Sequence, residues 1–289
     1  MCPLFGRAVE TNLETAGLPC TDQSRAGNQL YEQGPTAVVF IAHAKRHIQK
    51  RTPFIIIENV QELRIGIIRM LYGAHYDIVV LYVGTEDQGH DGGTRYRLYA
   101  LLNHRERVIA VYDAKEMYAR ITSVIRQHVR TQPCDYLVST EEEIMLDAGE
   151  TARTFATCSQ SVRRLASHKP VAFKFRFRRD PNKDKNLFLY LGDNVSNRLT
   201  WSAVSKRIPT LRMSGGKTWH VMSRRWLTGR EKLASLGFPV TASAADSMGV
   251  PELPVRDTKR ASAISGNCMH FSTVAVVQFV ALVCYKQTQ

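Results

Sequence analysis

The sequence predicts an α/β fold, and three features of residues 35–111 carry that prediction. The apolar run "PFIII" (Pro53 to Ile57) is typical of a strand buried on both faces of a parallel sheet. It lies between two helical patterns: "PTAVVFIAHAKRHIQKR", with proline near its start and basic residues at its end, and "VQELRIGIIRMLYG", which Gly73 closes. A second strand, "YDIVVLYV", follows, and this order predicts a right-handed crossover unit.

Further elements are expected along the chain. "YRLYALL" and "RVIAVY" flank the polar "NHRER" and are expected to pair as a hairpin. "STEEEIMLD" indicates a capped helix start, and "LTGREKLASLGFP" a short amphipathic helix that ends at Gly237 and Pro239. In the basic segment 163–185, "FKFRFR" alternates as a strand would, with one apolar and one cationic face. The apolar stretch Phe271 to Cys284 is expected to be a core helix.

Charge points to a polyanionic partner. The 289 residues include 39 Lys and Arg against 26 Asp and Glu, which gives a net charge of +13 and a pI near 9.6. Nucleic acid is the favoured partner, and an acidic membrane surface is the weaker alternative. No membrane-spanning segment is expected, because the longest apolar stretch is interrupted by Gln278 and is too short to span a bilayer, and the expected partner is nucleic acid and not a membrane. The expected location is the nucleus in a eukaryote and otherwise the cytoplasm.

The cysteines give one candidate nucleophile. The six are scattered without any CxxC pair, so we expect reduced thiols and no metal site. Cys20 follows a proline in the small, polar stretch "ETAGLPCTDQSRAGNQL", which is not core-like. A thiol on such a turn becomes a nucleophile when its surroundings lower its pKa. The alternative is an incidental loop cysteine.

Polar residues at the ends of the predicted strands are the other candidates. Glu58 and Asn59 end the buried strand, and ligands bind at the carboxyl ends of strands in open α/β sheets. Alternatively, Glu58 caps the following helix. Arg95 and Arg97 are spaced to share one face of a strand and to hold an anion, or they form a solvated strand edge.

Taken together, these residues resemble the DNA cytosine-5 methyltransferase family. "AGLPCTDQSRAGNQLYEQGPT" is similar to its proline-cysteine loop, with Pro19, Cys20 and Ser24 matching and Thr21 in place of the usual glutamine. "PFIIIENV" matches the Glu-Asn-Val motif, and "TRYR" resembles the Gln-x-Arg-x-Arg motif, with Gly93 in the glutamine's place. "RRWLTGREKLASLGFP" and "SGNCMHF" resemble the family's last two motifs, and all five appear in the family's order.

The resemblance implies a fold and a division of the chain. The fold would be an incomplete Rossmann-like sheet of the S-adenosylmethionine-dependent methyltransferase type, with a smaller inserted target-recognition domain. Residues 1–112 would form a partial catalytic domain and residues 113–205 the target-recognition region. Residues 206–289 would return to the catalytic domain.

The resemblance also implies a reaction on a cytosine flipped out of the duplex. Cys20 would attack ring carbon 6, Glu58 would supply a proton or hydrogen bond at ring nitrogen 3, and Asn59 would fix the loop. Arg97 and Arg95 would hold the nucleotide and stabilise developing charge. Carbon 5 would then receive the methyl group of S-adenosylmethionine.

Binding residues are implied as well. Pro19, Asn267 and Met269 would line the methyl-donor pocket. The residues expected to contact DNA are Ser24, Arg163, Arg164, Lys174, Arg176 and Arg178.

Three alternatives stay open. Only 19 residues precede Cys20, too few for the family's glycine-rich donor-binding unit. The chain would then belong to a longer methyltransferase, or complete its site with a separate partner chain. Otherwise it would be a catalytically inactive nucleic-acid-binding remnant. An RNA cytosine methyltransferase of the same family would use the same residues.

Overall fold

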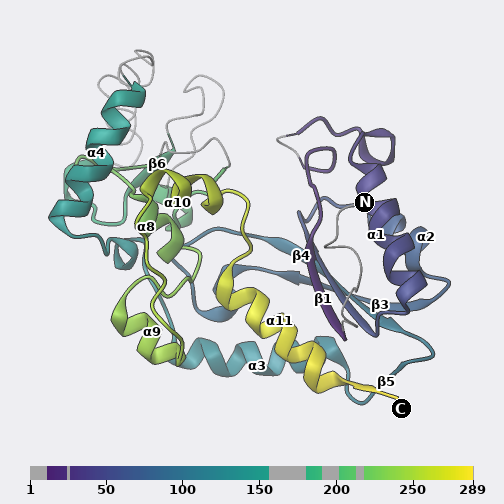
Figure 1. The fold of residues 1–289 in the computed structure, drawn as a ribbon. Coiled ribbons are helices and arrows are strands. Elements are labelled where there is room, and N and C mark those ends of the chain that lie inside the picture. The colour runs from purple at the N-terminus through teal and green to yellow at the C-terminus, as the bar shows by residue number, and fades with distance from the viewer. Residues whose placement is uncertain (1–11, 25–26, 156–179, 191–201, 213–217, 289) are drawn as a thin grey trace. The chain divides into compact units, whose positions relative to one another are not determined.

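The computed structural model describes residues 12–24, 27–155, 180–190, 202–212 and 218–288 (Figure 1). The chain divides into two compact units, described separately below. Unit 1 comprises Met1–Gly84, Tyr96–Val124 and Thr273–Gln289, and unit 2 comprises Thr85–Arg95 and Ile125–Ser272.

Unit 1 is built on a four-stranded sheet in the order β1-β2-β4-β3. Strand β1 pairs parallel to β2, whereas β4 pairs antiparallel to both β2 and β3. Strands β2 and β3 therefore run in the same direction with β4 between them. The sheet is partly parallel, as the α/β prediction requires. The strands are β1 (Leu13–Gly17), β2 (Phe54–Asn59), β3 (Tyr76–Val83) and β4 (Arg97–His104).

The predicted hairpin after residue 96 is wrong. Strand β5 (Val108–Ala110) pairs with β9 (Tyr285–Gln287) and not with β4. The reason is that β4 already pairs with β2 on one side and β3 on the other, so its backbone hydrogen-bonding groups are not available to a further strand.

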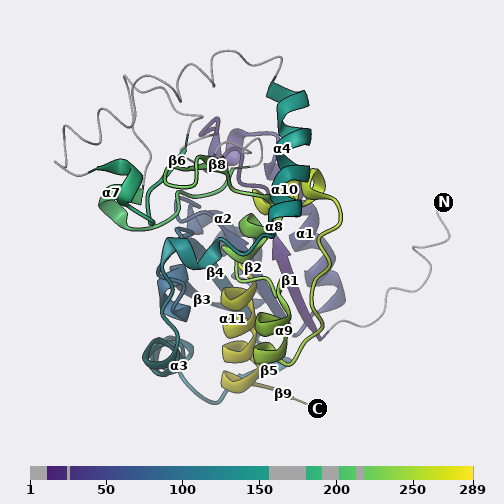
Figure 2. The same cartoon turned by 90° about the vertical axis from the view of Figure 1, so that its left-hand side faces the viewer.

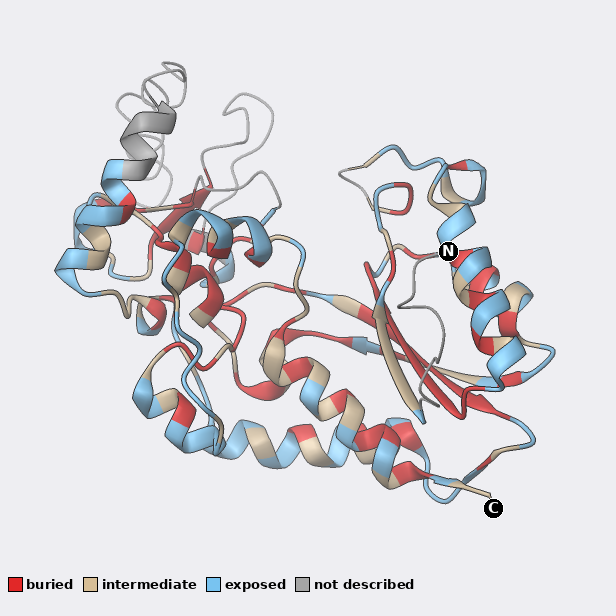
Figure 3. Ribbon diagram, in the orientation of Figure 1, coloured by how far each residue is buried: buried red, intermediate tan, exposed pale blue. Residues whose placement is uncertain are grey.

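Helices cover both faces of this sheet. On one face, Ile55, Ile57 and Leu98 pack against helices α1 (Ala37–Lys50) and α2 (Ile65–Tyr72). On the other, strand residues such as Ile56 and Leu101 pack against α3 (Ala114–His128) and α11 (Phe271–Cys284). In the turned view of Figure 2, α11 lies in front of the sheet and α1 and α2 lie behind it. Every residue of β2 is buried, as the run "PFIII" predicts for a strand covered on both faces (Figure 3).

Unit 2 contains a three-stranded antiparallel sheet in the order β6-β7-β8. Its core includes Tyr136, Phe188, Ile208 and Leu227. The strands are β6 (Phe188–Tyr190), β7 (Thr218–His220) and β8 (Arg225–Trp226). The helices are α4 (Glu141–Phe155), α7 (Ser202–Ser205), α8 (Gly229–Ala234), α9 (Ala242–Met248) and α10 (Thr258–Ser265). Single-turn helices lie at Thr85–Gln88, Pro133–Tyr136 and Pro181–Lys183, and a similar one in unit 1 at Tyr31–Gln33.

Two helix starts confirm their sequence signals. At α4, the amide of Glu143 donates to the Thr140 hydroxyl, and the amide of Thr140 donates to the Glu143 carboxylate. At α8, Thr228 and Glu231 form the same reciprocal box, although the helix is shorter than the predicted segment.

The boundaries of the two compact units differ from the predicted domain boundaries at residues 112 and 205. Unit 2 takes residues 125–272, so it joins the expected target-recognition region to most of the last segment. The functional division into three parts stays a prediction. The "FKFRFR" strand lies in 156–179, outside the described residues. Among the described helices, none combines the length and the apolar character needed to cross a bilayer.

Candidate active site

Three of the predicted catalytic segments meet at one end of the unit 1 sheet. Because β1 and β2 are parallel neighbours, with Gly17 opposite Glu58, the Cys20 loop and the Glu-Asn-Val turn leave the sheet at the same end. Strand β4 is antiparallel and begins there, with Leu98 opposite Asn59. Arg97, one residue earlier, therefore lies at this end too. The carboxyl ends of parallel strands are a common ligand-binding place in α/β sheets.

Asn59 connects the Cys20 loop to the end of β2. Its side-chain amide donates a hydrogen bond of 2.9 Å to the carbonyl oxygen of Leu18. Its side-chain oxygen, Oδ1, accepts a hydrogen bond of 2.9 Å from the backbone amide of Val60. Asn59 is buried, so both bonds lie away from competing water. These bonds join the Cys20 loop to the end of β2, and the functional role that the resemblance implies for Asn59 stays a prediction.

Glu58 and Arg97 form an ion pair, with Oε1 and Nε 2.9 Å apart. The side chains retain 9% and 17% of their exposure, so the pair is largely desolvated. The Arg97 guanidinium also donates 2.7 Å to the carbonyl oxygen of Tyr96, which restricts its orientation. Such a carboxyl group can accept a hydrogen bond from a ring when it is ionised or donate a proton when it is protonated, and the cation can balance developing charge.

The loop that carries Cys20 is folded around the buried carboxylate of Asp22. This carboxylate accepts hydrogen bonds from the backbone amide of Thr36 at 3.0 Å, the hydroxyl of Thr36 at 2.6 Å and the side-chain amide of Asn28 at 3.5 Å. The bond from the Thr36 hydroxyl, followed by that from the Thr36 amide, holds the pKa of Asp22 below its ordinary value. Gly34 is required here, since a Cβ at that position would lie 2.2 Å from the Asp22 carboxyl carbon.

Cys20 itself faces solvent. Its side chain is exposed and carries a free thiol. Its carbonyl oxygen accepts hydrogen bonds from the amides of Gln23 at 3.0 Å and Ser24 at 2.8 Å, so the residue opens a tight turn. The turn presents the thiol outward while Asp22 anchors the loop from inside. Ser24 is half-buried in the same turn.

Arg95 has surroundings unlike those of Arg97. Strand β4 begins at Arg97, so the two arginines do not share a strand face, contrary to their alternate spacing. The reason is that the preceding chain pairs within unit 2, where Gly93 bridges Ile208 and the Thr94 carbonyl accepts 2.9 Å from Thr210. Arg95 is buried and donates to the carbonyl oxygen of Cys268.

The predicted donor-binding residues are divided between the units. Pro19 is half-buried in unit 1. Asn267 is exposed and Met269 half-buried in the turn of unit 2 that also holds Cys268. Of the residues expected to bind DNA, five lie outside the described residues: Arg163, Arg164, Lys174, Arg176 and Arg178.

Sequence reasoning missed two groups. Asp22 gave no signal because its partner Thr36 is distant in the chain. The second group joins His43 and His47 to Glu14 of β1. The His-x-x-x-His spacing within "AHAKRHIQK" was its available signal, since residues four apart share a helix face.

Comparison with known proteins gives the fold and no more. No family model matches this sequence, and no curated protein matches it either. Among solved structures, the Entamoeba histolytica methyltransferase EhMeth is similar with a TM-score of 0.54 and 14% identity, over 94% of this chain and 77% of that one. The S. pombe Dnmt2 methyltransferase has a TM-score of 0.48 and 14% identity over the same shares. The likeness to EhMeth confirms the predicted fold class.

Proposed function

We propose that this chain is an S-adenosylmethionine-dependent methyltransferase that modifies carbon 5 of cytosine in DNA through a covalent cysteine adduct. One observation supports this above all: an exposed thiol and a desolvated Glu58–Arg97 pair leave adjacent strands at one end of the sheet. These are the groups that a conjugate addition to a pyrimidine needs. A soft nucleophile attacks the ring while an acid and a cation stabilise the charge that develops.

The chemistry follows from these groups. The Cys20 thiolate forms a bond to carbon 6 of the flipped base and breaks the 5,6 double bond. Glu58 donates a proton to ring nitrogen 3 as the thiolate adds, and Arg97 pairs with the carboxylate that remains. Carbon 5 becomes nucleophilic, and the sulfonium of a bound donor would supply its methyl group there and leave as a thioether. Water or another base then takes the carbon 5 proton, which restores the double bond, returns the nitrogen 3 proton to Glu58 and releases the thiolate.

The methyl donor is an expectation from the resemblance. Pro19 belongs to unit 1, and Asn267 and Met269 belong to unit 2, so the geometry within each unit does not assemble them into one pocket. The steps proposed for this chain's own residues are the addition to carbon 6 and the elimination that follows, and the methyl transfer between them would depend on the bound donor.

DNA is the proposed substrate because the chain carries a net charge of +13. Lysine and arginine bind the phosphate backbone and release its counterions, which gives affinity without sequence specificity. Ser24, in the Cys20 turn, and the basic residues of 163–178 are the proposed contacts.

A hydrogen-exchange reaction tests the nucleophile without the methyl donor. Once the thiolate adds to carbon 6, carbon 5 takes a proton from solvent, and elimination then removes either hydrogen. Cytosine tritiated at carbon 5 should therefore lose tritium to water in the presence of the protein. We expect release from a DNA oligonucleotide, loss of release in Cys20→Ser, and normal release in Cys134→Ser, whose half-buried thiol lies in unit 2.

Other outcomes would contradict the proposal. Release that persists in Cys20→Ser would exclude Cys20 as the nucleophile. Release from RNA alone would exclude DNA as the substrate. DNA binding by gel shift, without release from either oligonucleotide, would indicate an inactive binding protein.

A further inference from the structure

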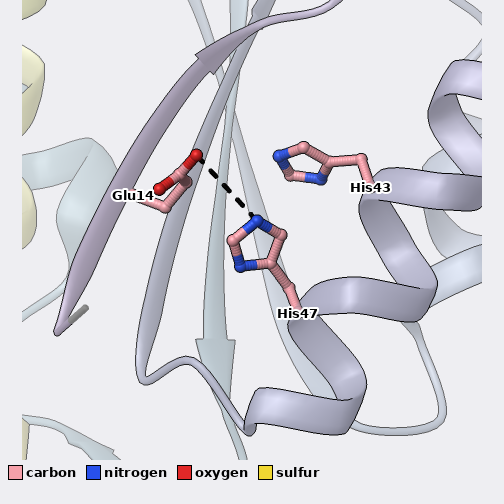
Figure 4. A group of neighbouring side chains, drawn as sticks. All are labelled: Glu14, His43 and His47. Atoms are coloured by element: carbon pink, nitrogen blue, oxygen red, sulfur yellow. Dashed lines mark ion pairs between the residues drawn. The ribbon is translucent and has the colours of Figure 1, made fainter. Parts of the chain in front are cut away.

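A second group of ligand-type side chains lies in unit 1, apart from the proposed catalytic residues. Figure 4 shows Glu14 on β1 pointing toward His43 and His47 on α1. One ligand atom from each residue lies within 4.8 Å of the other two. Glu14 Oε1 and His47 Nε2 are 3.9 Å apart, and the two imidazole rings are centred 4.3 Å apart.

In each of the two histidines, one ring nitrogen lies within hydrogen-bond distance of a hydroxyl group, and the other faces the cluster. His43 Nδ1 lies 2.5 Å from the Tyr72 hydroxyl, and His47 Nδ1 lies 2.9 Å from the Thr52 hydroxyl. Both Nε2 atoms are buried and have no hydrogen-bond partner among the residues that the structure describes. His47 is only 1% exposed. A buried nitrogen without a hydrogen bond is destabilising, so two of them facing one carboxylate require an explanation.

The hydroxyl partner Thr52 is itself held in place. Helix α1 ends at Lys50, and the capping residue Arg51, with a φ of 48°, turns the chain so that the Thr52 amide donates a hydrogen bond of 3.1 Å to the His47 carbonyl oxygen. The Tyr76 hydroxyl lies 3.0 Å from the carbonyl oxygens of both His47 and Thr52. With Nδ1–H donating to a fixed oxygen, the Nε2 lone pair points into the cluster. This is the arrangement by which proteins orient metal-binding histidines.

We propose that His43 Nε2, His47 Nε2 and a carboxylate oxygen of Glu14 bind one divalent transition-metal ion, zinc in the first instance. Two imidazoles and one carboxylate suit zinc, whereas magnesium and calcium prefer oxygen ligands alone. Ligands on a tetrahedral zinc lie about 3.3 Å apart, as bonds of about 2.05 Å require. The 3.9 Å separation of Glu14 and His47 therefore needs only a small side-chain adjustment.

Direct pairing of Glu14 with His47 does not account for the cluster. Their separation is too long for a hydrogen bond. Burial, reinforced by the nearby charge of Arg46, lowers the pKa of His47 to about 4. Burial, with the neighbouring His47, does the same to His43. Burial therefore disfavours a charged imidazolium paired with Glu14 as the reason for the cluster.

The metal would have a structural effect on the proposed active site. Strand β1 ends at Gly17 and helix α1 begins at Ala37, so the Cys20 loop connects the two elements that the metal would bridge. Binding would hold the two ends of this loop together. The inference does not depend on the proposed methyltransferase activity.

Metal binding by the full chain tests the proposal. The protein is dialysed against a chelator, then titrated with zinc by calorimetry and with cobalt by visible spectroscopy. We expect one zinc per chain and the absorption bands of tetrahedral cobalt. A variant Cys20→Ser, which removes the exposed thiol as a competing ligand, should bind equally well, and so should His75→Gln, which alters an exposed histidine.

Variants of the cluster give graded losses. Thr52→Val removes a hydroxyl that orients a ligand and should weaken zinc binding by about 10–100-fold. Glu14→Gln and His43→Gln remove ligands and should weaken it further. Glu14 is 28% exposed and His43 is half-buried, so both variants should fold even if a change at His47 does not. The absence of saturable zinc binding, or unchanged binding in Glu14→Gln and His43→Gln, would overturn the proposal.

Discussion

The side-chain amide of Asn59 donates a hydrogen bond to the carbonyl oxygen of Leu18, two residues before the exposed thiol of Cys20. This bond holds the cysteine loop to the end of the neighbouring strand. Asn59→Ala should leave a carbonyl without its partner and lower the free energy of unfolding by about 1–3 kcal/mol. It should also speed hydrogen exchange at the Gln23 and Ser24 amides. Urea unfolding and mass-detected exchange measure the two effects.

The matched control is Asn182→Ala. The Asn182 side chain makes an exposed hydrogen bond of 3.2 Å to Asp180, so its loss should change stability by less than about 0.5 kcal/mol. Equal effects of the two substitutions would mean that Asn59 does not anchor the loop.

Removing the acid of the Glu58–Arg97 pair should slow the proposed chemistry. Glu58→Gln keeps the shape of the side chain but gives up its charge and its ability to transfer a proton. We expect tritium release from cytosine to fall by about 10²–10⁴-fold, the usual contribution of a general acid or base. The control is Glu106→Gln, since Glu106 forms an exposed ion pair with Arg51. A rate for Glu58→Gln within twofold of the parent would remove Glu58 from the mechanism.

Elements with a local signal could be predicted from the sequence, and those set by strand pairing could not. The uninterrupted apolar run of β2 indicated burial on both faces, and Gly73 marked the end of α2. The pairing of β5 was missed because it depends on β9, at the far end of the chain. Alternation within a segment shows which residues share a face only if the whole segment is a strand, and Arg95 lies outside β4.

The same distinction applies to the site. Cys20, Glu58 and Arg97 were identified by residue type and motif order, and the sheet register then brought their segments to one end. The ion pair between Glu58 and Arg97 depends on β4 entering the sheet next to β2, which no local pattern encodes. The Glu14 and histidine group likewise depends on β1 lying beside α1. Contacts between distant segments were therefore the part that sequence could not supply.

Breaking a buried ion pair in unit 2 should lower the free energy of unfolding far more than breaking an exposed ion pair in unit 1. Arg225 donates two hydrogen bonds of 2.7 Å to Glu231, which has no exposed side-chain surface. Arg225→Ala would leave this carboxylate buried without its cation, at a cost of about 3–5 kcal/mol. Arg105→Ala breaks the exposed pair with Asp77 and should cost less than about 1 kcal/mol. Urea unfolding of both variants tests the contrast, and similar losses would contradict it.

Acid should destabilise unit 2 through His90. Its Nδ1 and Nε2 atoms form hydrogen bonds of 3.1 Å with the hydroxyl groups of Tyr136 and Ser272, respectively. Burial lowers the pKa of His90 to about 4, whereas an unfolded histidine titrates near 6.5. Between these values the unfolded state binds more protons, so stability is full above pH 6.5 and falls toward pH 4, by at most about 1.4 kcal/mol per pH unit for this group. Trp219 and Trp226 lie in unit 2, so tryptophan fluorescence in urea at pH 7, 6 and 5 follows its unfolding. The variant His90→Gln should be less stable than the parent at pH 7 but should lose less stability on acidification.

The control is the exposed His75, changed to Gln. If His90→Gln keeps the pH dependence of the parent, or if His75→Gln alters it to the same extent, His90 is not responsible.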